Sequence, residues 1–441
     1  MSIVPSFKLL IHSAQQIVQV VKNGEKFVVG KALSNVAVLK QSDASSGLSI
    51  IVSSDGFIED FGSDEEISEK YRVNDFQNKI DATGKCILPG LVDAHTHPVW
   101  AGDRVKEFSM KLSGFTYMDI HKVGGGIYYT VDQTTKASED DLLRLLKARL
   151  SEMLKCGTTL VEAKSGYGLE TESEMKMLRV LERAKRETDI EISSTFCGAH
   201  AVPKHMTSQE ATKAVLNEQL PALQKLMKSG EISVDNIDVF CEKGVFDLDQ
   251  SRSILEAGQK MGLQINFHGD ELHPMEAAKM GAYLNAHSIS HLEEISDQGI
   301  VAMAESGTAA VILPTTAYML KLTPPPVRKM IESGVVVALG TDFNPNAFCY
   351  SMPLVMHLAC VTCGMSMEEA LNASTINAAA SLGKSATHGS IEKGKQADFL
   401  IINAERWEHL IYQMAAQGSL INNVIKKGNV VYENANPKNL I

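Results

Sequence analysis

The feature that most constrains the fold is an alternation of short β-rich runs with helical patterns through the middle of the chain. Such alternation predicts consecutive β/α units and a parallel sheet. Eight runs have the apolar, β-branched composition of buried strands. They are Ile87–His97, Thr159–Lys164, Ile192–His200, Ile237–Glu242, Leu263–His268, Asn285–His291, Thr308–Pro314 and Val335–Asp342.

The segments between these runs carry helix signals. From Asp140 to Gly157, leucines recur on one helical face and the pattern stops at the glycine, which predicts an amphipathic helix. Thr171 and Glu174 have the spacing of a capping box, so we expect the next helix to begin there.

The length of this alternating region favours a closed barrel. The stretch from His95 to Asp342 matches the roughly 250 residues of a (β/α)₈ barrel. A doubly wound open sheet is the alternative, but the polar candidates fall at the C-terminal ends of strands, where barrel enzymes place their active sites. We therefore predict an α/β protein with a (β/α)₈ barrel over residues 87–390.

The two ends of the chain differ from the middle. Short apolar strands separated by turns occur before residue 86, and two more follow at Ala397–Asn403 and Val424–Tyr432. We expect residues 1–86 and 391–441 to form one small β-sandwich beside the barrel.

Composition narrows the class of protein. A net charge of −11 without a basic stretch argues against nucleic-acid binding. We expect no membrane contact, because the chain lacks a run of about 18 apolar residues and a signal-peptide pattern at its start. Seven scattered cysteines suit reduced thiols in the cytoplasm, and Cys360 with Cys363 reads as a pair of core thiols.

Histidines and an aspartate mark a metal site. His95 and His97 end the first expected strand at positions i and i+2, so their side chains point to one side, as a zinc-class divalent metal requires. His268 ends the fifth strand, and Asp342 ends the eighth. Three nitrogens and one carboxylate around a single opening leave room for a catalytic water on the metal.

This combination resembles the amidohydrolase superfamily from about Ile50 to about Glu433. Five segments resemble the imidazolonepropionase family more specifically, namely His97–Arg104 (HPVWAGDR), Lys164–Leu169 (KSGYGL), Cys197–His200 (CGAH), Asp238–Phe246 (DVFCEKGVF) and Thr341–Pro345 (TDFNP). That resemblance implies a hydrolase that opens the ring of 4-imidazolone-5-propanoate with water to give N-formimidoyl-L-glutamate, in histidine breakdown.

The resemblance also implies residue roles. His95, His97, His268 and Asp342 would bind one zinc or iron ion, which lowers the pKa of a bound water toward roughly 7. Glu271, His291 and Asp342 would move protons and stabilise charge. Substrate contacts would come from Arg104, Tyr117, Tyr167, His200, Glu271 and Asn344, and Arg104 can bind the propionate with two hydrogen bonds. The family further implies a homodimer.

Two departures from the superfamily pattern bear on these roles. The fourth expected strand ends at Glu242 with Lys243 one place beyond, so a carboxylated lysine and a second metal are not favoured. Lys164 on the second strand is expected to be salt-bridged or hydrogen-bonded. The loop Asn344-Pro345-Asn346 differs from the Asn-Pro-Gly of bacterial-like members.

Two other functions remain open at this point. A deaminase of the same superfamily would attack a cyclic amidine or purine carbon and release ammonia, although Arg104 and the tyrosines favour an anionic substrate. A barrel that serves only as an interaction protein would usually lack metal ligands, whereas all four are present here.

Overall fold

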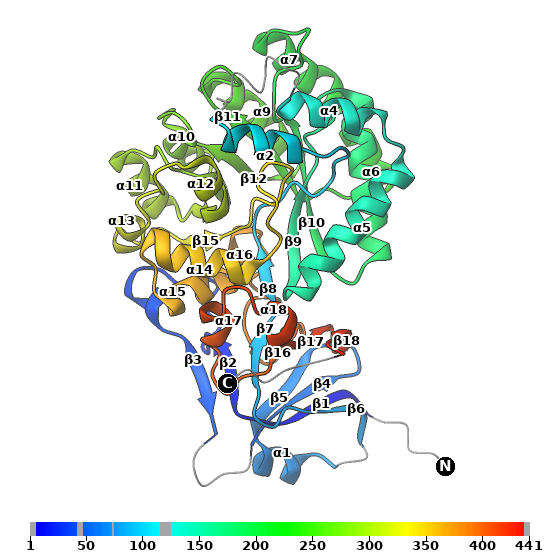
Figure 1. Ribbon diagram of the computed structural model, residues 1–441, viewed down its shortest axis with the longest axis vertical. Coiled ribbons are helices and arrows are strands. Elements are labelled where there is room, and N and C mark those ends of the chain that lie inside the picture. The colour runs from blue at the N-terminus through cyan, green and yellow to red at the C-terminus, as the bar shows by residue number, and fades with distance from the viewer. Residues whose placement is uncertain (1–5, 42–46, 73–74, 115–124, 436–441) are drawn as a thin grey trace.

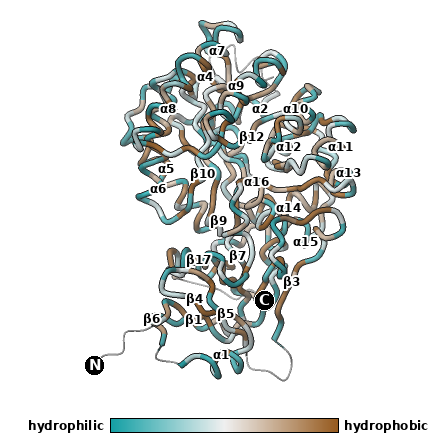
Figure 2. Tube along the Cα trace, turned by 180° about the vertical axis from the view of Figure 1, so that it is seen from behind, coloured by the Kyte–Doolittle hydropathy of each residue, from teal (hydrophilic) through white to brown (hydrophobic). Residues whose placement is uncertain are grey.

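The computed structural model describes residues 6–41, 47–72, 75–114 and 125–435. A barrel of parallel strands and surrounding helices forms the upper part of Figure 1, and two β-sheets lie below it. Seen from behind in Figure 2, helix α1 (Asp64–Lys70) at the base is hydrophilic, and much of the hydrophobic colouring follows the interior strands. Among the described helices, none has the length and apolar character needed to cross a membrane.

The barrel consists of eight strands that follow one another in sequence order, each parallel to the next. Their side chains are almost entirely buried, because helices cover the outside and side chains fill the inside. The strands are β8 (Leu91–Asp93), β9 (Thr158–Lys164), β10 (Glu191–Ala199), β11 (Asn236–Cys241), β12 (Gln264–Gly269), β13 (Ser288–His291), β14 (Ala309–Ile312) and β15 (Val337–Leu339). The predicted barrel is thus confirmed.

The seam between β8 and β15 is closed by residues just beyond the two strands. The Asp342 N–H donates to the His95 carbonyl at 3.0 Å, and the His97 N–H donates to the Phe343 carbonyl at 2.9 Å. The Asp93 carboxylate accepts from both the backbone N–H and the hydroxyl of Thr341, at 2.9 and 2.6 Å. Closure therefore brings the segments of His95, His97 and Asp342 together.

One predicted barrel strand is divided in the structure. Ile87–His97 was expected as a single strand, but β7 (Cys86–Pro89) pairs with β16 (Phe399–Ile402) in a lower sheet, and only β8 belongs to the barrel. Gly90 separates the two. A Cβ at Gly90 would lie 2.1 Å from Thr159 Oγ1, so the chain can cross between the sheets here only because glycine has no side chain.

The helices cover the barrel in sequence order. They are α2 (Val105–Leu112), α4 (Ile127–Lys136), α5 (Glu139–Lys155), α6 (Thr171–Glu187), α7 (Ser208–Ala214), α8 (Leu220–Lys228), α9 (Leu248–Lys260), α10 (Ala277–Tyr283), α11 (Asp297–Ser306), α12 (Pro314–Leu320), α13 (Val327–Glu332), α14 (Met352–Cys363), α15 (Met367–Ala373) and α16 (Ile376–Ser381). A π-helical turn at Val215–Gln219 joins α7 to α8.

Helices α5 and α6 test the two sequence predictions. Helix α5 buries Leu142, Leu146 and Leu150 as predicted, and Ser138 caps its first turn. Helix α6 begins where predicted, but the capping box is wrong: its N-cap residue is Glu170, and no side-chain cap forms. The Glu174 carboxylate turns inward and accepts from the preceding loop instead.

Both ends of the chain build the lower sheets, as predicted. One sheet has the order β5-β4-β1-β6, and the other has the order β18-β17-β16-β7-β2-β3. Apolar residues from both sheets, including Ile11, Ile50 and Phe399, form one buried core. The strands are β1 (Phe7–Ala14), β2 (Gln16–Val20), β3 (Ala37–Lys40), β4 (Leu48–Ser53), β5 (Ile58–Ser63), β6 (Phe76–Asp81), β17 (Ile421–Lys426) and β18 (Asn429–Glu433).

Short helices complete this part, namely the 3₁₀ turn Gly30–Ser34, α17 (His409–Tyr412) and α18 (Gln417–Leu420). The division of the chain into domains at residues 1–86, 87–390 and 391–441 remains a proposal. All seven cysteines are free thiols, and Cys360 and Cys363 both lie on α14.

Candidate metal centre and active site

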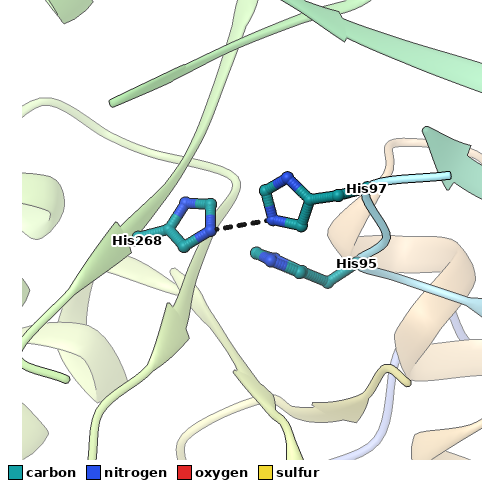
Figure 3. A group of neighbouring side chains, drawn as sticks. All are labelled: His95, His97 and His268. Carbon is teal, nitrogen blue, oxygen red and sulfur yellow. Dashed lines mark hydrogen bonds between the residues drawn. The ribbon is translucent and has the colours of Figure 1, made fainter. Parts of the chain in front are cut away.

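Three histidines meet at the mouth of the barrel (Figure 3). His95 and His97 follow β8, His268 lies on β12, and one ring nitrogen of each lies within 4.8 Å of the other two. The Nε2 atoms of His97 and His268 face each other across 3.1 Å, as the dashed line in Figure 3 marks. Residues separated by more than 170 positions thus present their nitrogens to a common point.

The fourth predicted ligand joins this group. Asp342 Oδ1 lies 3.5 Å from His95 Nε2 and 3.7 Å from His97 Nε2. Its other oxygen, Oδ2, accepts from the Thr316 hydroxyl at 2.5 Å. The backbone of Asp342 has φ of +47°, a left-handed conformation that costs energy for a non-glycine residue and often marks functional sites.

The protonation state of His95 and His97 favours metal binding. Burial lowers the pKa of His95 and of His97 well below its usual value, so both rings are neutral, which is the form that binds metal ions. Among the described residues, buried His95 Nε2 has no hydrogen-bond partner. A buried nitrogen without a partner is costly unless something binds it, so the donor set fits a transition metal.

A buried ion pair supports His268 from behind. The Asp238 Oδ1 atom accepts from His268 Nδ1 at 2.9 Å, so that Nε2 of the same ring is the nitrogen that faces the other histidines. Lys164 Nζ lies 2.7 Å from Asp238 Oδ2 and 2.7 Å from Glu162 Oε1. Burial alone would lower the pKa of Lys164, but these two carboxylates raise it above its ordinary value.

The charges of this network do not favour a second metal site at Cys197, Asp238 and His268. Burial would raise the pKa of Asp238, yet His268 and Lys164 hold it at about 2, so Asp238 is ionised. Cys197, Asp238 and His268 also lie close enough to share a metal. However, Asp238 already pairs with Lys164, and burial raises the pKa of Cys197, which keeps it a thiol. The prediction that Lys164 is salt-bridged is confirmed.

Glu271 and His291 lie next to the histidine cluster. Glu271 Oε2 is 3.5 Å from His291 Nε2, and the ring of His291 stacks near that of His268 with centroids 5.3 Å apart. Burial, followed by the charges of Glu293 and Asp342, raises the pKa of Glu271 well above its usual value. Burial lowers the pKa of His291. A carboxyl group that holds its proton beside a neutral imidazole can exchange a proton with a bound molecule.

Two predicted substrate residues, His200 and Tyr167, lie beside the His97 ring. The His200 ring stacks on the His97 ring with centroids 4.6 Å apart and an interplanar angle of 12°. The Tyr167 ring lies 5.9 Å from that of His97 and 5.3 Å from that of His200. Both residues therefore lie within reach of a molecule at the metal site, whereas Tyr117 lies outside the described residues.

Arg104 immediately precedes α2. Its Nε and Nη2 atoms contact Glu107 Oε2 at 2.8 and 2.7 Å. It lines a cavity of about 620 Å³ together with Trp100, Arg149 and Asn346. The guanidinium is thus held in place by one carboxylate, at the edge of a space large enough for a small molecule.

The Asn344 side chain stabilises the loop after β15 through hydrogen bonds to the backbone of that loop. Its Nδ2 donates to the Asp342 carbonyl at 2.7 Å, and its Oδ1 accepts from the Asn346 N–H at 2.7 Å. The Asn346 side chain contacts Lys111 of α2. Asn344 therefore shapes the backbone around Asp342 in this structure.

Several residues that support the site were not predicted from the sequence to have that role. They are Asp93, Glu162, Glu174, Asp238, Ser290, Glu293 and Thr316. The Ser290 hydroxyl lies 2.8 Å from His95 Nδ1, and the Glu293 carboxylate lies 3.7 Å from His291 Nδ1. A signal existed for Asp93 and Asp238, because each is a carboxylate inside an otherwise apolar strand and needs a buried partner.

Comparison with known proteins places this geometry in a family. The sequence pattern of the amidohydrolase family matches residues 86–431. Probable imidazolonepropionases from Homo sapiens and Nematostella vectensis are 60% and 59% identical over 425 and 424 residues, covering 96% of this chain and 98% and 99% of the relatives. The chain belongs to the imidazolonepropionase family of amidohydrolases.

Solved structures agree on the fold. An atrazine chlorohydrolase from Arthrobacter aurescens, crystallised with zinc, superimposes with a TM-score of 0.68. The match covers 97% of this chain and 96% of that protein, at 15% identity. The fold of this chain is thus shared with that chlorohydrolase, and a shared fold does not by itself decide the activity.

Proposed function

We propose that the chain hydrolyses 4-imidazolone-5-propanoate to N-formimidoyl-L-glutamate, a step of histidine degradation. The observation that carries this proposal is about 60% identity, over nearly the full chain, to relatives of that name. The convergence of His95, His97, His268 and Asp342 supports it, because ring opening needs an activated water.

These four residues would hold one divalent or trivalent transition-metal ion, zinc or iron. When bound, the ion would lower the pKa of a water toward about 7 and polarise the ring carbonyl. His268 contributes Nε2, because its Nδ1 donates to Asp238. The Lys164–Asp238 pair keeps this ring oriented and electron-rich, which favours metal binding.

Proton transfer would fall to three side chains. Water adds to the ring carbonyl, the adjacent carbon–nitrogen bond breaks, and the leaving nitrogen gains a proton. Asp342 lies beside the histidine nitrogens and can accept the proton of the water. Glu271 and His291 face each other and can relay a proton to the ring nitrogen and stabilise developing charge.

Recognition of the substrate would use its charge and its ring. Arg104 would bind the propionate carboxylate, since a guanidinium offers two parallel donors. Tyr167, His200 and Glu271 would contact the ring, and Tyr117 and Asn344 complete the proposed set. We further propose a cytoplasmic homodimer without nucleic-acid or membrane partners. The seven free thiols support the cytoplasmic location, and the net charge of −11 supports the absence of a nucleic-acid partner.

Incubation of the purified protein with imidazolone propionate tests the proposal. The ultraviolet absorbance of the ring should decay, N-formimidoyl-L-glutamate should form mole for mole, and removal of metal with a chelator should stop the reaction. Ammonia release from a purine or cyclic amidine instead would identify a deaminase. Absence of any turnover in the metal-loaded protein would contradict the assignment.

A further inference from the structure

A buried carboxylate organises the loop that carries Tyr167. Glu174 lies in the first turn of α6 and is fully buried. Its Oε1 atom accepts from the Gly168 and Leu169 N–H groups at 2.7 and 2.8 Å, and its Oε2 atom accepts from the Gly166 N–H at 3.0 Å. Three backbone N–H groups thus converge on one side chain.

The loop conformation depends on this convergence. Gly166 has φ of +104° and Leu169 has φ of +60°, so the chain turns sharply on both sides of Tyr167. Gly168 packs so tightly that an added Cβ would lie 2.5 Å from the Glu174 nitrogen. Converging backbone N–H groups form a concavity that binds acceptor oxygens, and the two oxygens of Glu174 occupy it.

The other side of the same loop fixes His200. The Gly166 carbonyl lies 2.9 Å from His200 Nδ1, and because a carbonyl can only accept, Nδ1 must carry the proton. In this tautomer Nε2 accepts hydrogen bonds, and the ring stacks against that of His97.

We infer that Glu174 is a positioning residue for substrate recognition. It fixes the loop so that the Tyr167 hydroxyl and the acceptor nitrogen His200 Nε2 face a bound ring together, one as donor and the other as acceptor. This pair is suited to a heterocycle that carries both a carbonyl and an N–H, as the imidazolone of the proposed function does. The inference rests on that function for the identity of the ligand, and on the loop geometry for the role of Glu174.

The kinetic test compares Glu174→Gln with a matched control. The amide replaces one acceptor oxygen with a donor that opposes the loop N–H groups. We expect kcat/KM for imidazolone propionate to fall about 10–100-fold, mainly through KM, with metal content unchanged. Glu369→Gln alters another buried carboxylate, which belongs to the capping box of α15 and is not among the proposed site residues, and should keep kcat/KM within about twofold. Equal kcat/KM in both variants would overturn the inference.

A spectroscopic test is independent of turnover. In protein with ¹⁵N-labelled histidine, the His200 signal, identified by its loss in His200→Gln, should show a neutral ring protonated on Nδ1. Glu174→Gln should shift this signal toward a mixture of tautomers. A proton on Nε2 in the wild-type protein would refute the role. If the spectra behave as expected but the wild-type protein does not open imidazolone propionate, only the proposed function fails. Should Glu174→Gln not fold, Glu174→Asp, which keeps the charge but shortens the reach, carries both measurements.

Discussion

Replacing Asp238 with asparagine should weaken metal binding without unfolding the chain. Asp238 accepts from His268 Nδ1 at 2.9 Å through one oxygen and pairs with Lys164 at 2.7 Å through the other. The amide keeps the shape and one acceptor, but it loses the negative charge that makes His268 a strong donor. Removal of such supporting groups typically costs about 10–100-fold in metal affinity, equivalent to about 1.4–2.7 kcal/mol.

The stability cost can be bounded from the same contacts. Removing one partner of an isolated buried ion pair costs about 3–5 kcal/mol. Lys164 keeps its second partner Glu162 at 2.7 Å, so the free energy of unfolding should fall by less than that range. The metal-free variant should therefore remain folded at room temperature.

The assay is a metal titration in competition with a chelator of known affinity, with elemental analysis of the retained metal and a thermal melt of each metal-free protein. Asp398→Asn is the matched control, because Asp398 is also buried and pairs with Lys426 at 2.6 Å, but in the lower sheets. It should lose stability and keep its metal affinity. Equal metal affinity in Asp238→Asn and the wild-type protein would refute the reasoning.

Three other predictions address recognition, proton transfer and pH. Arg104→Lys would lose the proposed two-bond contact with the propionate, so the transition-state stabilisation measured by kcat/KM should fall by about 1.5–3 kcal/mol; loss of metal or of folding instead would show a structural role. Glu271→Gln and His291→Asn should each keep the metal, measured by elemental analysis, while kcat falls about 10²–10⁴-fold; near-normal turnover in both would remove them from the mechanism. Burial would raise the pKa of Glu191, but His388, Lys426 and Gln396 hold that pKa well below the ordinary 4.5. The ionised Glu191 therefore contributes its full stability above pH 4.5. This contribution is lost as the pH falls from 4.5 toward the lowered pKa. The difference in unfolding free energy between wild type and Glu191→Gln, measured by urea titration, should therefore shrink from pH 6 toward pH 3, and a difference that stays constant would contradict this account.

The sequence was sufficient to predict the barrel and to identify four residues that meet at its mouth. Parallel strands carry their C-terminal ends to one face, so His95, His97, His268 and Asp342 could be placed together from strand order alone. The division at Gly90 could not be predicted, because β7 and β8 are equally apolar and only their partner strands distinguish them. Local composition contains no information about such pairing.

The capping box predicted at Thr171 and Glu174 shows a second limit of prediction from sequence. Thr171 and Glu174 satisfy the local pattern, yet the loop after β9 offers Glu174 three N–H groups where a cap would use one. Tertiary contacts therefore override a local preference worth about 1 kcal/mol. The Asn344 side chain likewise binds its own loop, because the Asp342 carbonyl accepts from its Nδ2 and the Asn346 N–H donates to its Oδ1.

The position of the seam has a consequence for synthesis of the chain. His95 and Asp342 lie on opposite edges of the strand series, and the hydrogen bonds beside them join its first and last members. On the ribosome, the nascent polypeptide carries the three histidines proposed as ligands long before Asp342 emerges from the exit tunnel. High-affinity metal capture should accordingly coincide with release of the last strand, and arrested chains that end before Asp342 should retain metal poorly when passed over a chelating resin.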